Sequence, residues 1–150
     1  MKNIEVAELL NKIADYLEFD EEQFKVRAYR KAALVVEGLS EDIEQVWKEN
    51  RLEELPGIGG GIAKKIDDFL KNSKSKYLEE LKRSTPADIE ELGKIEGIGP
   101  KTIFKLYEEL KVKNVKDLEK AAKQGKIQKI KGLGPVVEKN ILKSIEFARK

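Results

Sequence analysis

The sequence contains no cysteine and no histidine among its 150 residues. These absences exclude disulfide scaffolds, zinc sites built on Cys or His, cysteine nucleophiles and histidine general bases. Only 4 residues are proline, and the longest apolar run, residues 32–36, is too short to span a membrane. Acidic residues interrupt the N-terminal segment where a signal peptide needs a continuous apolar core. We therefore expect a cytoplasmic protein with no membrane partner.

Charged residues are abundant, at 39% of the chain, but their signs are unevenly distributed. Residues 1–50 have 7 bases and 12 acids, residues 51–94 have 9 of each, and residues 95–150 have 14 bases and 7 acids. The net charge thus changes from −5 through 0 to +7, which makes the C-terminal third the expected contact for a polyanion. Alternatively, these lysines only solvate the surfaces of helices.

One motif occurs three times, as LPGIGGGIAKKI from residue 55, IEGIGPKTIFKL from residue 95 and IKGLGPVVEKNI from residue 130. Each copy has two glycines around one apolar residue, and another apolar residue seven positions after the second glycine. The pairs start 40 and then 35 residues apart. They are Gly57 and Gly59, Gly97 and Gly99, and Gly132 and Gly134.

Two glycines in such a motif allow a tight turn, while the apolar residue between them anchors the turn in the core. The helix that follows directs its free N–H groups and the positive end of its dipole outward. A phosphate oxygen can approach this backbone because no side chain covers it. Such a contact reads no base edge, so the motif predicts sequence-independent binding to a nucleic-acid backbone.

Elsewhere, apolar residues recur at helical spacing and no segment alternates convincingly with a period of two, which predicts an all-α protein. We place a domain boundary near residues 84–86, between a domain of residues 1–84 and one of residues 85–150. The expected helices cover residues 3–18, residues 23–37 up to Gly38 and a segment from the cap Ser40 to Trp47. A short helix precedes the first glycine pair, and a longer one follows it to about Asn72. Further helices are opened by Thr85 with Pro86, by Pro100 and by Pro135, and one covers residues 115–122 behind the cap Asn114.

The three copies differ at the fourth position after the second glycine, where crossing helices favour a small residue. The first copy has Ala63 there, the second Ile103 and the third Glu138. Glu138 adds an acid near the expected phosphate, so we expect the third copy to bind least and mainly to buttress the second.

The motif resembles the helix-hairpin-helix at all three places. AYRKAA at residues 28–33, followed by LPGIGGGIAKKIDDFL at residues 55–70, resembles the amino-terminal lyase domain of family X DNA polymerases. IEGIGPKTIFKLYEELKVKNVKDLEKA resembles the DNA-binding subdomain that follows in that family. The resemblance covers about residues 4–145 and is closest to the bacterial and archaeal branch. It implies a helical bundle followed by a tandem helix-hairpin-helix domain.

The family's function implies a monomeric, nucleoid-associated protein of base excision repair that binds gapped, nicked or abasic-site DNA. The family's nucleotidyl-transfer domain, with three carboxylates that hold two magnesium ions, has no counterpart before Lys150. Asp67 and Asp68 are adjacent on a helix and are expected to be solvated acids. We therefore expect this chain not to polymerise DNA, either as a fragment of a longer polymerase or as a small relative.

In the family, the first domain removes a 5′-deoxyribose phosphate through a Schiff base between a lysine amine and the sugar aldehyde. The matching lysine is Lys65. The resemblance places phosphate-binding residues at Lys25 and Tyr29, with Lys31 nearby, whereas one family phosphate lysine falls on Gly61. Besides the glycine turns, the expected DNA-binding residues are Lys25, Tyr29, Lys31, Lys64 and Lys101.

The family also binds a monovalent cation, Na⁺ or K⁺, through carbonyl oxygens of the hairpins, and no other cofactor is expected. The matching carbonyls are those of Glu53, Leu55 and Ile58 in the first copy and Gly93, Ile95 and Ile98 in the second.

A helical wheel places Lys65 at the edge of an apolar face, next to Phe69, and turns Lys64 toward water. Partial desolvation at the edge favours the neutral amine that a nucleophile needs. Alternatively, Lys65 only extends its head to water from an apolar stem. Lys25 lies between Ala28 and Tyr29 on an apolar face if the helix includes it, where it needs an anionic partner; alternatively, it precedes the helix.

Two competing functions fit the same residues. The hairpins could form a DNA-binding module without chemistry, which Schiff-base trapping would distinguish from a lyase. The chain could instead be a helical protein-interaction domain, which a salt-dependent DNA titration would distinguish from both.

Overall fold

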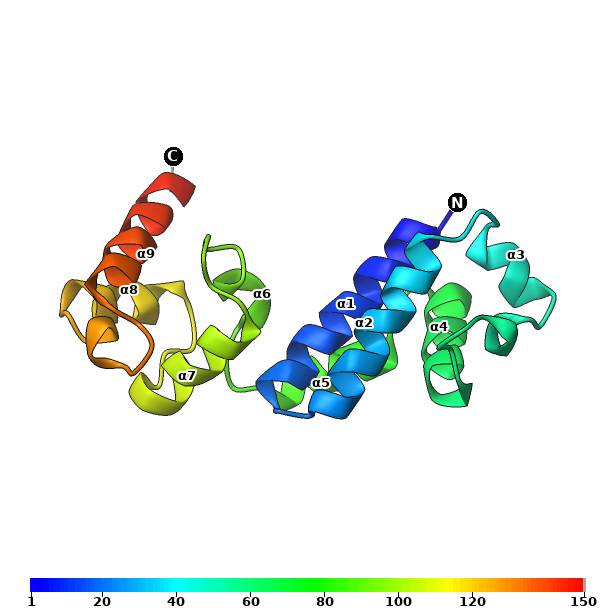
Figure 1. Ribbon diagram of the computed structural model, residues 1–150, viewed down its shortest axis with the longest axis horizontal. Coiled ribbons are helices and arrows are strands. Elements are labelled where there is room, and N and C mark those ends of the chain that lie inside the picture. The colour runs from blue at the N-terminus through cyan, green and yellow to red at the C-terminus, as the bar shows by residue number, and fades with distance from the viewer. Residues whose placement is uncertain (150) are drawn as a thin grey trace. The chain divides into compact units, whose positions relative to one another are not determined.

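The structure is a computed structural model that describes residues 1–149, and its contacts divide the chain into two compact units, Met1–Ser84 and Thr85–Lys150. The described residues are helical and contain no strand, which confirms the all-α prediction (Figure 1). The elements of the first unit are α1 (Asn3–Phe19), α2 (Gln23–Glu37), α3 (Ile43–Lys48), η1 (Leu52–Glu54), α4 (Gly60–Asn72) and α5 (Lys76–Ser84). Those of the second unit are α6 (Ile89–Leu92), α7 (Pro100–Leu110), α8 (Val115–Lys123), η2 (Ile127–Lys129) and α9 (Pro135–Ala148).

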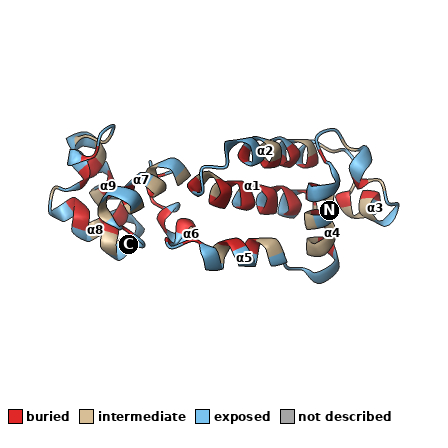
Figure 2. Cartoon of the chain, turned by 90° about the horizontal axis from the view of Figure 1, so that it is seen from below, coloured by how far each residue is buried: buried red, intermediate tan, exposed pale blue. Residues whose placement is uncertain are grey.

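The core of the first unit forms around α1, which lies between α2 and α5 (Figure 2). Apolar residues three or four apart give α1 a continuous stripe, and its members are fully buried. They include Val6, Leu10, Ile13 and Leu17, each 0% exposed. Tyr29 on α2 and Ile66 on α4 are also buried, so the first glycine turn is attached to this bundle.

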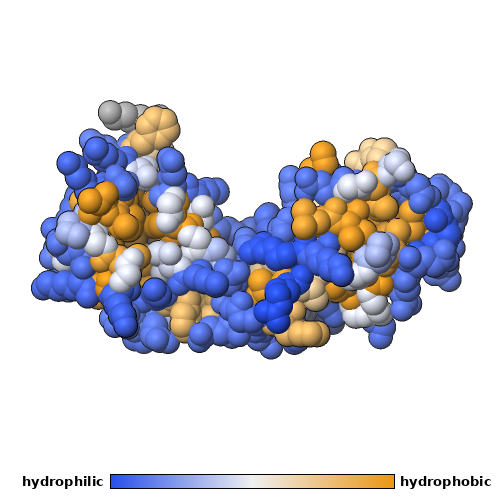
Figure 3. Space-filling view, viewed as in Figure 1, coloured by the Kyte–Doolittle hydropathy of each residue, from blue (hydrophilic) through white to orange (hydrophobic). Residues whose placement is uncertain are grey.

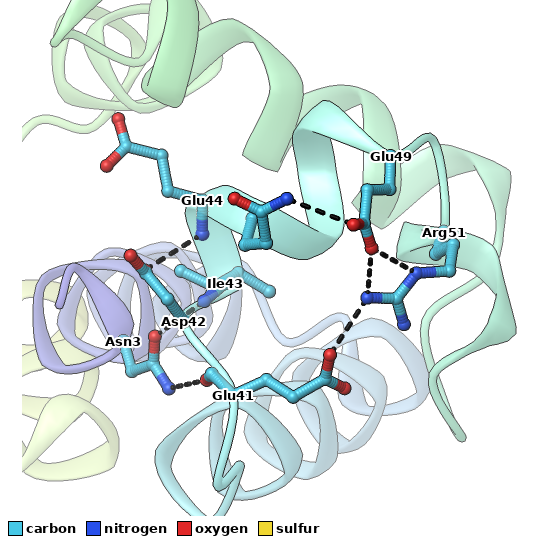
Figure 4. A network of polar contacts seen from close by, with 8 residues as sticks. Asn3, Glu41, Asp42, Ile43, Glu44, Glu49 and Arg51 are labelled. Carbon is cyan, nitrogen blue, oxygen red and sulfur yellow. Dashed lines mark hydrogen bonds and ion pairs between the residues drawn. The ribbon is translucent and has the colours of Figure 1, made fainter.

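The start of α3 is fixed by a polar network rather than by the expected cap Ser40 (Figure 4). The buried Asn3 side chain donates to Glu41 O at 2.7 Å and accepts from Ile43 N at 2.8 Å. Asp42 is the N-cap, because its carboxylate accepts from Glu44 N at 3.1 Å. The prediction of Ser40 was wrong because Asn3, distant in sequence, binds the backbone at Glu41 and Ile43, and α3 begins only after Asp42.

The second unit also differs from the sequence at its first helix. Thr85 and Pro86 do not open a helix: residues 86 and 87 form a bend, and Asp88 N donates to Lys113 O at 2.8 Å rather than within a helix. Asp88 caps α6 instead, accepting from Glu91 N at 3.0 Å. The large side chains that are fully buried in this unit are Leu92, Ile103, Leu106, Leu118, Ile127, Ile141 and Ile145.

Hydrophilic residues dominate the visible faces of both units (Figure 3). No helix among residues 1–149 is long and apolar enough to cross a membrane. A few large apolar side chains are nonetheless exposed: Met1, Ile4, Phe24, Leu34, Val136 and Phe147.

Candidate functional site

The three glycine turns share one backbone geometry. The first glycine of each pair has a positive φ, namely +82° at Gly57, +88° at Gly97 and +90° at Gly132. L side chains disfavour this region, so these positions need glycine. In each turn the N–H of the middle apolar residue donates to the carbonyl three positions earlier, at 3.0–3.2 Å.

The second glycine of each pair serves a different purpose. Gly59, Gly99 and Gly134 are extended, and each is the N-cap of the helix that follows. A Cβ atom at any of them would meet nothing within 4 Å. No side chain of the described residues caps α4, α7 or α9 by a hydrogen bond. The backbone at Gly99 and Gly134 is therefore open at the start of α7 and α9, whereas at the start of α4 the Glu53 carboxylate lies nearby, since its Oε1 would be 3.4 Å from a Cβ at Gly60.

The surroundings of the turns differ in their nearest cations. A Cβ at Gly57 would lie 3.5 Å from carbons of the Lys31 side chain, so Lys31 runs across the first turn. A Cβ at Gly132 would lie 3.2 Å from Lys105 Nζ, whereas one at Gly97 would meet nothing. Sequence reasoning missed Lys105, because it belongs to the helix after the second turn but lies at the third. Lys101 is exposed on the first turn of α7.

Glu138 does not have the place expected of it. The side chain is only 7% exposed, and both carboxylate oxygens accept hydrogen bonds from Gln128, one from its backbone N–H and one from its side-chain amide, each at 3.0 Å. The carboxylate expected beside the phosphate is therefore buried and already occupied by Gln128, while weaker phosphate binding at the third turn stays a prediction. This carboxylate attaches η2 to α9 and occupies a core position, as Ile103 does in the second copy.

A pocket of about 480 Å³ lies beside the first glycine turn. Helices α2, α4 and α5 contribute its walls together with the turn itself. The lining residues are Phe24, Lys25, Ala28, Tyr29, Gly57, Gly59, Gly61, Ile62, Lys65 and Tyr77. The pocket thus brings together Lys25, Tyr29, the first glycine pair and Lys65.

Lys64 is not among the lining residues of this pocket. It is exposed and lines a different hollow with Trp47 and Asp67, whereas Lys65 is half-buried. Lys25 lies within α2, so it does not precede the helix. Its ammonium is 3.5 Å from Glu22, and its side chain is 55% exposed at the pocket. An anion that binds Lys25 has to compete with the Glu22 carboxylate.

Two tyrosines form the aromatic wall of the pocket. The rings of Tyr29 and Tyr77 are stacked, with centroids 6.4 Å apart and planes inclined by 22°, and Lys65 Nζ lies 4.7 Å from the Tyr77 centroid. Burial, and then the neighbouring Tyr77, raise the pKa of Tyr29 to about 12. Burial also raises the pKa of Tyr77, although Lys25 opposes this effect. Both phenols are therefore neutral near pH 7 and can donate hydrogen bonds to an anion.

Asp67 and Asp68 are structural acids rather than merely solvated ones. Asp67 accepts from Trp47 Nε1 at 2.7 Å and thereby attaches α4 to α3. Asp68 accepts from Lys76 N at 2.9 Å, at the start of α5. Hydrogen bonds to the Asp68 carboxylate, of which this backbone contact has the largest effect, lower its pKa. Sequence reasoning missed α5 and with it Tyr77. The only signal was the spacing of Tyr77, Leu78 and Leu81 within a highly charged segment.

Two of the six carbonyls expected to hold a cation, those of Leu55 and Ile95, already take part in the turns. Leu55 O accepts from Ile58 N at 3.1 Å, and Ile95 O accepts from Ile98 N at 3.2 Å. Each oxygen retains a second lone pair that a cation could use. Among the described residues, no group of three Asp or Glu side chains could hold a metal ion.

Comparison with known proteins matches the two parts of the chain separately. A helix-hairpin-helix domain family matches residues 1–75, and a SAM-like helix-hairpin-helix tandem matches residues 89–146. Over 151 aligned residues the chain is 35% identical to the N-terminal region of the DNA polymerase/3′-5′ exonuclease PolX of Bacillus subtilis (strain 168). The alignment covers 100% of this chain but only 26% of that family X DNA polymerase.

Proposed function

Because this chain belongs to the helix-hairpin-helix domain family, we propose that it binds the backbone of gapped or nicked DNA without reading its base sequence. The observation that carries this proposal is the geometry of the three glycine turns. Each presents an uncapped helix N-terminus at a position where a Cβ would meet nothing. Backbone N–H groups contact phosphates equally well in any sequence. The similarity to a DNA polymerase supports DNA as the polyanion.

A titration of fluorescent duplexes tests this proposal. We expect similar affinities for two gapped duplexes of unrelated sequence, and a loss of about tenfold or more between 50 and 200 mM salt if several phosphates are bound. Strong preference for one sequence, or affinity independent of salt, would contradict it. A helical protein-interaction domain would show neither tight binding nor this salt dependence.

We further propose that the pocket beside the first turn is a 5′-deoxyribose phosphate lyase site with Lys65 as its nucleophile. The half-buried amine shares the pocket with Lys25 and the neutral Tyr29 hydroxyl, which supply a charge and a donor for a terminal phosphate. The open backbone of Gly57 and Gly59 adds room for phosphate oxygens.

Borohydride trapping tests this chemistry, because borohydride reduces the Schiff base to a stable amine. The substrate is a nicked duplex with a 5′-deoxyribose phosphate. We expect Lys65→Ala to lose most of the covalent adduct and to keep DNA binding, whereas the neighbouring control Lys64→Ala retains the adduct. An adduct unchanged by Lys65→Ala would show that another amine reacts.

A module that binds DNA without this chemistry is the second candidate. It is favoured by the glycine at position 61, to which the family resemblance assigns a phosphate-binding lysine, and by the ion pair of Lys25 with Glu22. Complete absence of an adduct, with DNA binding intact, would establish this candidate.

We also propose that Na⁺ or K⁺ occupies the carbonyls of the first two hairpins when DNA is bound. Replacing KCl by tetramethylammonium chloride at equal ionic strength should then weaken DNA binding. Equal affinity in the two salts would contradict this.

A further inference from the structure

The aromatic ring of Tyr77 faces the amine on which the proposed chemistry depends. Lys65 Nζ lies 4.7 Å from the ring centroid, within the range of a cation–π contact. We propose that Tyr77 is a positioning residue that holds the Lys65 nitrogen in the pocket and stabilises it whenever it is positively charged. This inference rests on the lyase function proposed above.

The position of Tyr77 is built into the fold. The Asp68 carboxylate, three residues after Lys65 on α4, accepts from Lys76 N at 2.9 Å and from Asn72 Nδ2 at 2.8 Å. The buried Ser75 hydroxyl accepts from Leu78 N at 3.1 Å in the first turn of α5. Because Asp68 on α4 binds the first residue of α5, these local contacts place the Tyr77 ring beside Lys65.

A second contact restrains the ring from α2. Tyr77 stacks against Tyr29, which is only 7% exposed. Stacked aromatic rings have few alternative orientations, so the electron-rich face of Tyr77 is presented at a defined place in the pocket. Three helices therefore contribute to one arrangement of amine and ring.

The charge on the Lys65 nitrogen changes during the proposed reaction, and the Tyr77 ring attracts this nitrogen only in its cationic forms. The Lys65 ammonium and the sugar aldehyde condense with loss of one water, and a protonated C=N bond replaces the C=O bond. The nitrogen is thus cationic before and after condensation and neutral only in between. A water molecule then accepts a C2′ proton, the C–H electron pair moves toward nitrogen, and the C3′–O bond breaks with its electrons on the DNA phosphate. Hydrolysis by a second water frees Lys65.

Because the nitrogen is cationic both as the ammonium and in the protonated C=N bond, the negative ring face holds it at the same place in the pocket before and after condensation, and the protonated C=N bond is the species that borohydride reduces. We expect Tyr77→Leu to lower the yield of trapped adduct about two- to fivefold, the range typical of such contacts at partly exposed sites. Tyr77→Phe keeps the ring and should restore the yield to within about twofold of the wild type.

The decisive measurement uses fluorinated phenylalanines at position 77, which weaken the ring face at nearly constant shape. Adduct yield should fall stepwise as fluorines are added, which a merely structural side chain would not produce. The matched control is Tyr107→Leu, which removes a cation–π contact of similar length, 5.0 Å to Lys111, in the second unit. This control should leave the adduct unchanged.

A second readout needs no DNA. Reductive ¹³C-methylation of the protein should give a Lys65 methyl signal shifted upfield by the ring current of Tyr77. Lys65→Arg identifies the signal, and Tyr77→Leu should return it to the position of an exposed lysine.

The outcomes distinguish the role of Tyr77 from the lyase function on which it rests. No adduct with the wild type would refute the lyase and the role of Tyr77 together. An adduct that requires Lys65 but has the same yield with leucine or with fluorinated rings at position 77 would refute the role of Tyr77 alone.

Discussion

Gly61 offers a direct test of how the pocket binds phosphate. It is the second residue of α4 and lines the pocket, and it is the position to which the family resemblance assigns a phosphate-binding lysine. A Cβ there would meet nothing within 4 Å, and φ lies outside the positive region, so a side chain fits without strain. Gly61→Lys should therefore strengthen binding to DNA that carries a 5′-phosphate at a nick or gap.

The expected size follows from the position. A charge about 6 Å from a phosphate in a water-like dielectric contributes about 0.7 kcal/mol, or roughly threefold in affinity. One added phosphate contact should also steepen the salt dependence, by about 0.7 to 0.9 in log affinity per log salt. Stability should hardly change, because replacing glycine in a helix gains about 0.7 kcal/mol while a cation near the N-terminus costs about 0.3–1 kcal/mol.

Gly61→Glu is the matched control, because it changes the sign of the charge at similar helix propensity. It should stabilise the fold by about 1 kcal/mol, since an anion suits a helix N-terminus, and it should weaken DNA binding. Fluorescence anisotropy at several salt concentrations measures affinity, and urea unfolding measures stability. If lysine and glutamate shifted affinity in the same direction, or if lysine left it unchanged, the pocket would not be the phosphate site.

Substitutions at the glycine turns, at Glu138 and at Tyr29 also have defined outcomes. Gly97→Val and Gly132→Val should each weaken DNA binding in anisotropy titrations while far-UV circular dichroism stays helical, because a β-branched residue opposes the positive φ of both turns; full binding by either folded variant would make that turn structural. Glu138→Ala should lower stability by about 1–3 kcal/mol, because two donors of Gln128 lose their acceptor, and Glu138→Gln should lose less; equal melting temperatures would contradict this. Burial raises the pKa of Tyr29 from 10.0 to about 12 in the folded state, so its contribution to stability is complete below pH 10 and is lost as the pH rises toward 12. Tyr29→Phe should therefore flatten the decline of the urea midpoint in that pH window, and an unchanged slope would refute the assignment.

The sequence was most informative where the cause of structure is local. Glycines at fixed spacing imply a turn with positive φ, and helical periodicity was enough to place Lys65 at the edge of an apolar face. The sequence was not informative where contacts with segments distant along the chain determine the local structure. Ser40 is as good a cap as Asp42 in isolation, but Asn3 selects the later start of α3. Tyr77 was missed because α5 is short and charged, and only its packing against α2 and α4 reveals a role.

The contact of Lys105 with the turn at Gly132 has a consequence for how the second unit can be dissected. Lys105 belongs to α7, which follows the second turn, yet its ammonium lies at the third. Losses caused by substitutions in α7 and at the third turn should therefore not add independently, since residues that share a contact usually show coupling. A truncated protein that kept the third turn without α7 would lose the Lys105 ammonium at that turn, so the third hairpin has to be measured together with the second.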